Sequence, residues 1–509
     1  MDKEKLDLSV GDALRPFKGL ARLAFEEASS HMNMYVNDPK SKGWSAPEPL
    51  QAAQESFHGY LKDIGWKRPA WSGVGYDCFA FLDGGTTRGF DLILQVLSEK
   101  YKRLEREGAG KPVLIMPVPT YGYFTMMPDL YGIDVIKVER DLENQAALDM
   151  DKLTEAIKGC HDKGQTILGY YDCSPNNPMG FVRSAEETTQ VAQTMAKLKN
   201  IYEADAKMRN SSFPYLIDDQ VYRGLVYGKD CEIPSFSQVQ YQSDENNLFD
   251  QTLTLFGPSK SGLAGIRTGI VVGESSFISN IQHLQQHGSY FPSYLSLATI
   301  RHFYASEGEG ANMRKRFIGR LNSDHRFGGL IMKALINGMD TMSELSQGDR
   351  DRIIKTVSNR KNITQKEVIS LLSEGIRGVS IITTPEAGFF HVIDLNKDEP
   401  NEKVWRSAEK GQLYSSVEKS DNLFDKKVTI ETLLKDDNVS LAYLQWAGYE
   451  AKESLRRVSF AVPLLDIFSF TDRLKAASDK FYSVISEQQM VDSEIAGAKG
   501  AGRSLSFHA

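Results

Sequence analysis

Lys260 is the side chain of this sequence whose position most favours chemistry. It follows the apolar run of residues 252–256 and precedes glycines at positions 262, 265 and 269. Glycines permit a tight turn, so the lysine is expected in a constrained and partly desolvated loop. Burial lowers the pKa of a lysine and makes its amine nucleophilic. The alternative is a surface turn whose glycines serve only the bend.

Glycines and hydroxyls gather after another apolar run. Residues 79–101 predict a strand, a glycine pair and a helix with apolar residues on one face. Gly85, Thr86 and Thr87 would lie at the N-terminus of that helix, where free N–H groups and the helix dipole favour an anion. We interpret them as a phosphate cradle, and the alternative is a turn that only connects two elements.

Two more buried runs end in distinctive turns. Residues 112–117 predict a strand that Tyr121 follows, and a tyrosine there can lie flat on a ring. The alternative for Tyr121 is a place in the core. Residues 166–171 predict a second strand, which leads into the proline-containing turn Ser174–Gly180. The prolines fix this turn and aim the amide of Asn177, which can donate a hydrogen bond.

An acid and a tyrosine end the predicted strand near residue 215. Asp219 and Tyr222 are three residues apart, and Asp218 is the competing carboxylate. Near the C-terminus, residues 455–461 contain the adjacent pair Arg456 and Arg457, of which Arg456 is expected to be solvated.

The order of these motifs resembles that of the fold-type I, pyridoxal-phosphate-dependent aminotransferases of class I and II. Arg267 follows Lys260 by seven residues, where most of that family has eight, and this shorter loop is similar to that of valine–pyruvate aminotransferases. Gly257 replaces a serine that is common in the family. Of the two neighbouring acids, only Asp219 has the family's spacing.

The resemblance implies a role for each matching residue. Lys260 would hold pyridoxal 5'-phosphate (PLP) as a Schiff base and later act as the base that moves the α-proton, with Asp219 and Tyr222 as its catalytic companions. Asn177 and Arg457 would bind the substrate, with Arg457 on its α-carboxylate. The cofactor-binding residues would be Gly85, Thr86, Thr87, Tyr121, Asn177, Asp219, Tyr222, Ser259, Lys260 and Arg267.

The resemblance also implies a fold and an assembly. We expect an α/β fold with a mostly parallel seven-stranded sheet, helices on both faces, and a smaller α+β C-terminal domain. The alternation of predicted strands and helices favours the α/β class independently. The expected divisions are an N-terminal arm with part of the small domain at 1–75, a large PLP-binding domain at 76–305, and a small domain at 306–509 that contains a charged insertion at 396–445. A homodimer with active sites at its interface is expected.

Composition excludes several other classes of protein. The 509 residues include 41% hydrophobic and 25% charged residues, as in an ordinary globular enzyme. A net charge of −7 argues against nucleic acid as a partner. We expect a cytoplasmic protein without a membrane span, a secretory signal or disulfides. No metal is expected, since His283 and His287 have a helical spacing but no evident third ligand.

The sequence therefore predicts a PLP-dependent aminotransferase that transfers the amino group of an L-amino acid to a 2-oxo acid. Lyases, decarboxylases and oxidases that use the same cofactor are the first alternative. A catalytically degenerate PLP-binding regulator or scaffold is an alternative of another class, suggested by Gly257 and by the long insertion.

Overall fold

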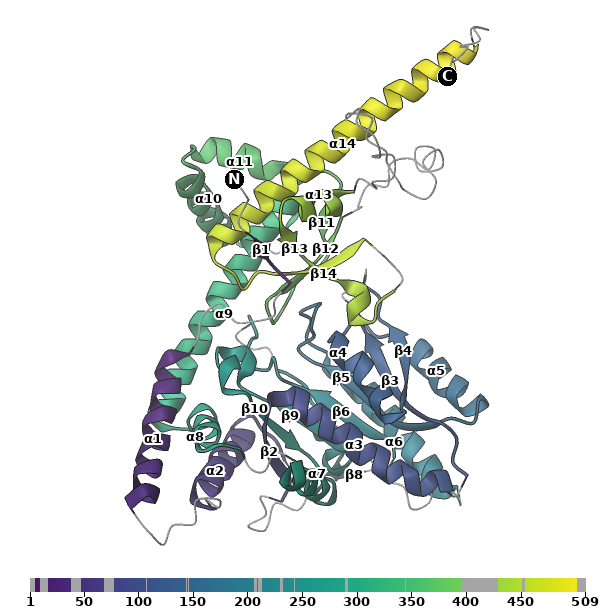
Figure 1. Ribbon diagram of the computed structural model, residues 1–509, viewed down its shortest axis with the longest axis vertical. Coiled ribbons are helices and arrows are strands. Elements are labelled where there is room, and N and C mark those ends of the chain that lie inside the picture. The colour runs from purple at the N-terminus through teal and green to yellow at the C-terminus, as the bar shows by residue number, and fades with distance from the viewer. Residues whose placement is uncertain are drawn as a thin grey trace.

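The computed structural model has a seven-stranded sheet at its centre (Figure 1). It describes residues 5–9, 17–37, 47–67, 77–106, 108–142, 144, 146–205, 208, 213–228, 232–241, 243–288, 292–343, 345–395, 429–450 and 454–500. In spatial order the strands are β2 (Phe79–Asp83), β10 (Thr268–Val272), β9 (Thr252–Phe256), β6 (Tyr215–Asp219), β5 (Thr166–Cys173), β3 (Pro112–Val118) and β4 (Asp134–Glu139). β10 runs antiparallel to both of its neighbours, and the remaining pairs are parallel.

Alternate side chains of each strand enter two different cores. On β3, Leu114 and Met116 join the cluster that contains Phe90 of α3 (Gly85–Arg106). Val113 and Ile115 point the other way, into the cluster formed with α5 (Met150–Asp162) and α6 (Ala185–Ala204). This period of two is the pattern of a strand that is buried on both faces. The expected mostly parallel sheet with helices on both faces is confirmed.

A four-stranded antiparallel sheet forms the second lobe, in the order β11, β12, β15 and β14. Its strands are β11 (Ser380–Ile381), β12 (Phe390–Asp394), β15 (Leu455–Ser459) and β14 (Ala442–Tyr443). The accompanying helices are α9 (Gly308–Asn337), α10 (Gln347–Lys361), α11 (Gln365–Ser373), α13 (Ile430–Asp436) and α14 (Leu464–Gly500). Figure 1 shows α9 running from this lobe down to α1 and α8. Most of the expected insertion, residues 396–428, lies outside the described residues.

The N-terminal residues contact both lobes. β1 (Leu6–Asp7) pairs in parallel with β13 (Val439–Ser440), and the Ser459 N–H donates to the carbonyl of Leu8. Farther along, α1 (Lys18–Asn37) and α2 (Pro47–Asp63) lie against α8 (Tyr294–Phe303). The other elements are α4 (Gly122–Met126), α7 (Ser275–Gly288), β7 (Gln240–Tyr241) and β8 (Ser243–Asn247). Among the described helices, none is long and apolar enough to cross a membrane.

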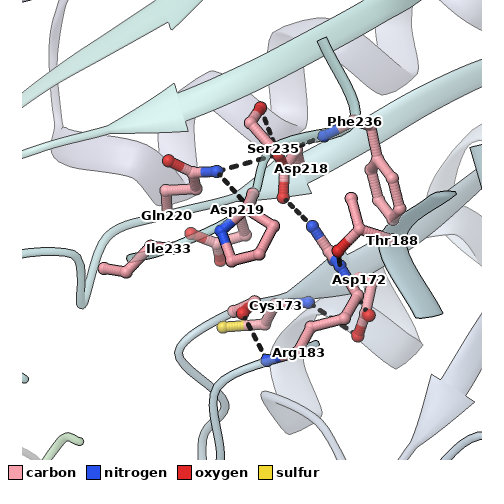
Figure 2. A network of polar contacts seen from close by, with 12 residues as sticks. Asp172, Cys173, Arg183, Thr188, Asp218, Asp219, Gln220, Ile233, Ser235 and Phe236 are labelled. Carbon is pink, nitrogen blue, oxygen red and sulfur yellow. Dashed lines mark hydrogen bonds and ion pairs between the residues drawn. The ribbon is translucent and has the colours of Figure 1, made fainter. Parts of the chain in front are cut away.

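Two neighbouring carboxylates on β5 and β6 are held by a buried arginine (Figure 2). Asp172 pairs directly with Asp218 in the parallel register, and both side chains have zero exposure. Arg183, also fully buried, donates from Nη1 to Asp172 and from Nη2 to Asp218, each at 3.0 Å. Arg140 at the end of β4 gives Asp172 a second partner at 2.8 Å. These ion pairs tie the carboxyl ends of three strands together.

Removing the bridging arginine should destabilise the protein strongly. Arg183→Met would leave two adjacent buried carboxylates with one cation fewer, and breaking a buried ion pair costs about 3–5 kcal/mol. The midpoint of thermal unfolding should therefore fall by several degrees. Arg103→Met, which removes an exposed arginine of α3, is the matched control. Equal midpoints for the two variants would contradict this account of the network.

Candidate active site

One edge of the central sheet collects most of the predicted residues. β3, β5, β6 and β9 are parallel, so Asp219 at the end of β6 lies on the same side as Tyr121, Asn177 and Lys260, which stand in the turns after the other three strands. β10 runs in the opposite direction, so its beginning lies at this edge and brings Arg267, the residue before it, to the same place. Ligands of α/β sheets bind at this edge, beyond the carboxyl ends of the strands.

A cavity of about 110 Å³ lies at this edge. Nine predicted residues line it, together with Phe124, Cys173 and Val221: Thr86, Thr87, Tyr121, Asn177, Asp219, Tyr222, Ser259, Lys260 and Arg267. A second cavity of about 460 Å³ adjoins the first, because Tyr121, Asn177 and Lys260 line both, and it contains Arg457. The structure therefore brings the residues of the sequence prediction together around two connected cavities.

The glycine-rich end of the inner cavity is tightly built. A Cβ atom on Gly269 would lie 2.5 Å from the backbone carbon of Gly85 and 2.8 Å from the nitrogen of Thr86, so glycine allows β10 to approach the start of α3. Arg267 has a left-handed φ of 54° and donates from Nη2 to the carbonyl of Gly84 at 2.9 Å. A guanidinium group thus lies beside the N-terminus of a long helix, and both favour an anion such as a phosphate group.

The Asp219 side chain is buried and points to the face of the sheet opposite to the ion pairs of Asp218. Successive side chains of a strand point to opposite faces, so Asp218 joins Arg183 while Asp219 faces the cavity. Asp219 is 3% exposed, and its oxygens accept hydrogen bonds from the Val221 N–H at 3.1 Å and the Tyr171 hydroxyl at 3.0 Å. Burial raises the pKa of Asp219 to about 6, against the lowering effect of those hydrogen bonds.

A chain of hydrogen bonds joins the two cavities. Arg457 donates from Nη1 to the Asn177 Oδ1 at 3.0 Å, and the Asn177 Nδ2 donates to the Tyr222 hydroxyl at 3.1 Å. The Lys260 Nζ lies 5.8 Å from the centre of the Tyr222 ring. Burial raises the pKa of the Tyr222 hydroxyl well above its ordinary value, so this group stays protonated and can donate a hydrogen bond.

Arg457 uses two of its five N–H donors within the protein and keeps others for a ligand. It is 7% exposed, and its Nη2 donates to the carbonyl of Ser9 at 2.6 Å. Its Nε is buried and has no hydrogen-bond partner among the described residues. Arg456 differs from the expectation of a solvated neighbour: it is 5% exposed and pairs with Glu431 of α13. Arg456 and Arg457 are successive residues of β15, so their side chains point to opposite faces of the sheet. Both are buried, because other parts of the chain cover both faces.

Sequence reasoning missed several residues that complete the site. Tyr171 and Cys173 lie on β5, and their alternation with Asp172 along the strand was the available signal. Ser9 and Trp446 meet Arg457 only through contacts between distant parts of the chain, for which the sequence carries no local pattern. Among the described residues, no group of three or more His, Cys, Asp or Glu side chains could hold a metal ion.

Replacing Asp219 by asparagine should stabilise the cofactor-free protein at neutral pH. The raised native pKa means that ionisation of Asp219 disfavours folding; this cost develops as the pH rises from about 4 to about 6 and stays constant above that. Asp219→Asn should therefore increase the free energy of unfolding by about 1–3 kcal/mol at about pH 8 and by much less near pH 4. Thermal unfolding at both pH values measures the difference.

The control for this substitution is Asp162→Asn, because the Asp162 side chain is 62% exposed at the end of α5. It should leave the midpoint unchanged at both pH values. A loss of stability in Asp219→Asn at the higher pH would contradict the assigned cost of burial.

Comparisons with known proteins agree with this geometry. The family model "Aminotransferase class I and II" matches residues 102–323. Alanine aminotransferase 2 of Xenopus tropicalis is 27% identical over 164 residues, which are 31% of this chain and 28% of that protein. The (5-formylfuran-3-yl)methyl phosphate transaminase of Methanocaldococcus jannaschii is 31% identical over 157 residues, 31% of this chain and 32% of that one. The matched part thus spans less than a third of either relative.

Solved structures match over nearly the whole chain. An aromatic aminotransferase from Pyrococcus horikoshii has a TM-score of 0.62 at 15% identity, with 94% of this chain and 96% of that chain covered. A variant of Thermus thermophilus aspartate aminotransferase has a TM-score of 0.61 at 16% identity, with 93% and 92% covered. At such identities the likeness concerns the fold. The fold is therefore that of aminotransferase fold type I, and residues 102–323 are similar to the class I and II aminotransferases.

Proposed function

We propose that this protein is a PLP-dependent aminotransferase that moves the amino group of an L-amino acid to a 2-oxo acid, with Lys260 as the residue that binds the cofactor covalently. The observation that carries the proposal is the shared cavity. A lysine, a buried carboxylate, an asparagine–tyrosine pair and an arginine at a helix N-terminus line the same 110 Å³ space, although they come from separate turns.

The inner cavity has a partner for each part of the cofactor. Gly85, Thr86 and Thr87 start α3, and they would hold the phosphate group together with Ser259 and Arg267. Tyr121 would lie against the pyridine ring. Asn177 and Tyr222, which already share a hydrogen bond, would donate to the phenolic oxygen.

Asp219 would accept a hydrogen bond from the protonated nitrogen of the pyridine ring. A cation beside this carboxylate would favour its ionised form and offset the cost of burial that raises its pKa. The bound cofactor supplies an electron sink for the bond that breaks at the α-carbon of the substrate. Asp219 would support this property by keeping the ring nitrogen protonated.

Arg457 would bind the substrate α-carboxylate. Its buried Nε has no partner among the described residues, and its Nη1 is already directed by Asn177. A carboxylate bound there would place the α-carbon near Lys260, since both residues line the 460 Å³ cavity. Lys260 would then accept the α-proton of the substrate and transfer it to the carbon atom of the cofactor that receives the amino group.

The expected homodimer belongs to this proposal as well. The outer cavity, which Tyr121, Lys260 and Arg457 line, would lie near the interface with the second subunit. The expectation of a cytoplasmic enzyme accords with small, water-soluble amino acid and 2-oxo acid substrates.

The first test is covalent attachment of the cofactor. We expect PLP, fixed by borohydride reduction, to add the mass of one cofactor to the peptide that contains Lys260. Lys260→Ala should lose this modification. Lys100→Ala is the matched control, because burial lowers the pKa of Lys100 and the residue lies outside both cavities.

Addition of amino acids then separates the reactions. An aminotransferase converts the cofactor to its pyridoxamine form and releases one equivalent of the 2-oxo acid. Release of carbon dioxide would identify a decarboxylase, and release of ammonia with consumption of oxygen would identify an oxidase. Attachment to Lys260 without any reaction would favour the degenerate regulator or scaffold, and absence of attachment would refute the enzyme assignment.

Arg267 provides a second, independent test. Arg267→Ala removes the cation beside the start of α3, and loss of a charge-assisted contact to phosphate should weaken PLP binding about tenfold or more. The side chain is exposed, so the fold should persist. Arg316→Ala removes an exposed arginine of α9 as a control. Titration with PLP, followed by absorbance, measures the affinities; equal dissociation constants for the two variants would contradict the phosphate assignment.

A further inference from the structure

We propose that the 460 Å³ cavity selects amino acids with large neutral side chains, aromatic ones above all. The inference rests on the proposed function and names its substrate class. Four aromatic residues line this cavity, Tyr121, Tyr123, Tyr443 and Trp446. They come from two separate parts of the chain, the turn after β3 and the segment that contains β14.

The position of the substrate side chain follows from the two groups of the substrate that are already assigned to Arg457 and Lys260. Arg457 would hold the α-carboxylate, and Lys260 must reach the α-carbon. Both groups lie on the lining of the outer cavity, and Lys260 also lines the inner one. The substrate side chain therefore extends into the remainder of the outer cavity, where the aromatic residues form the wall.

The aromatic rings of this wall are arranged to receive another ring. Trp446 meets Tyr121 at a centroid distance of 5.4 Å and an interplanar angle of 83°. It meets Tyr123 at 5.4 Å and 86°. Edge-to-face and offset contacts between aromatic rings contribute about 0.5–1.5 kcal/mol beyond the burial of their area. A phenyl or phenol ring would gain such contacts, whereas a methyl group would fill little of the space.

Tyr443 is fixed by cations on its far side. Its hydroxyl accepts a hydrogen bond from the Lys435 Nζ at 2.5 Å, and the guanidinium carbon of Arg456 lies 3.9 Å from the centre of its ring. Both cations also pair with Glu431. Glu431 balances one of the two positive charges, and Tyr443 itself presents an uncharged side chain to the cavity.

The charges of the lining disfavour an acidic or basic side chain. Among the described lining residues, the charged ones are Lys260 and Arg457, and the proposed function assigns these to the cofactor and to the α-carboxylate. The second carboxylate of an acidic substrate would lose water without gaining a further cation from these residues. A basic side chain would find no carboxylate among the same residues. Uncompensated burial of a charge is costly in either case.

Binding of unreactive acids tests this selection without any chemistry. We would measure, by calorimetry on the PLP-loaded protein, the dissociation constants of 3-phenylpropionate, butyrate and glutarate. Each has a carboxylate for Arg457, and they differ in the group that enters the cavity. We expect 3-phenylpropionate to bind at least tenfold more tightly than the other two. Equal affinities, tighter binding of glutarate, or no binding by any of the three would overturn the proposal.

Variants of Trp446 test whether the aromatic residues of the outer cavity cause the preference for 3-phenylpropionate. Trp446→Ala should weaken 3-phenylpropionate about tenfold and butyrate little, while Trp446→Phe should keep most of the preference. Tyr449→Ala is the matched control, because Tyr449 lies on the same segment but lines a different cavity of about 610 Å³. A preference that survives in Trp446→Ala, or that Tyr449→Ala removes as well, would overturn the assignment to this wall.

The two proposals fail in different ways. Conversion of the cofactor by alanine or aspartate, together with equal affinities for the three acids, would leave the aminotransferase proposal standing and refute the selection. Tight binding of 3-phenylpropionate without cofactor conversion by any amino acid would refute the aminotransferase proposal and retain the aromatic preference of the cavity.

Discussion

Asp172 and Asp218 lie side by side on neighbouring strands, and the protein must neutralise both because neither side chain has access to water. Arg183 does so by bridging them, and its guanidinium carbon lies 3.7 Å from the centre of the Phe236 ring. A buried ion network of this kind gains little net stability over an apolar core, because desolvation of the charges is costly. Its effect is on geometry: it fixes the register of β5 against β6 at the end where the site begins.

The alternation of a strand turns this register into a site. Cys173 and Asp219 follow the two buried aspartates along their strands. Their side chains point to the other face of the sheet and line the inner cavity. Tyr171 points to that face too, and its hydroxyl reaches Asp219 across the strands. A slip of one residue would exchange the two faces and bring the wrong aspartate to the cavity. The bridge through Arg183 therefore determines which of the two acids can meet a cofactor.

The sequence predicted the parts of the site that depend on local chemistry. Lys260 and Asn177 stand in turns after buried runs, and Asp219 ends such a run. Parallel strands bring these positions to one edge of the sheet, so the predicted fold class places the three residues together. Arg456, Ser9 and Trp446 could not be placed in this way. The contact of Arg457 with Ser9 joins residues 448 positions apart, and its contact with Asn177 spans 280 positions. Such contacts depend on how two lobes meet, which no local pattern of residues encodes.

The arrangement separates the chemistry from the choice of substrate. The inner cavity is lined by side chains at the ends of the central strands and in the turns and helices beside them, and buried charges hold β5 and β6 in register there. Burial raises the pKa of Asp219 in this cavity. The outer cavity takes Trp446, Tyr443 and Arg457 from the smaller lobe. Lys260, Tyr121 and Asn177 line both cavities. Under the proposed function Lys260 would meet the α-carbon of a substrate, while the smaller lobe would bind the α-carboxylate through Arg457 and meet the side chain through Tyr443 and Trp446. Changes in the smaller lobe can therefore alter the preferred amino acid without disturbing the groups that would bind the cofactor.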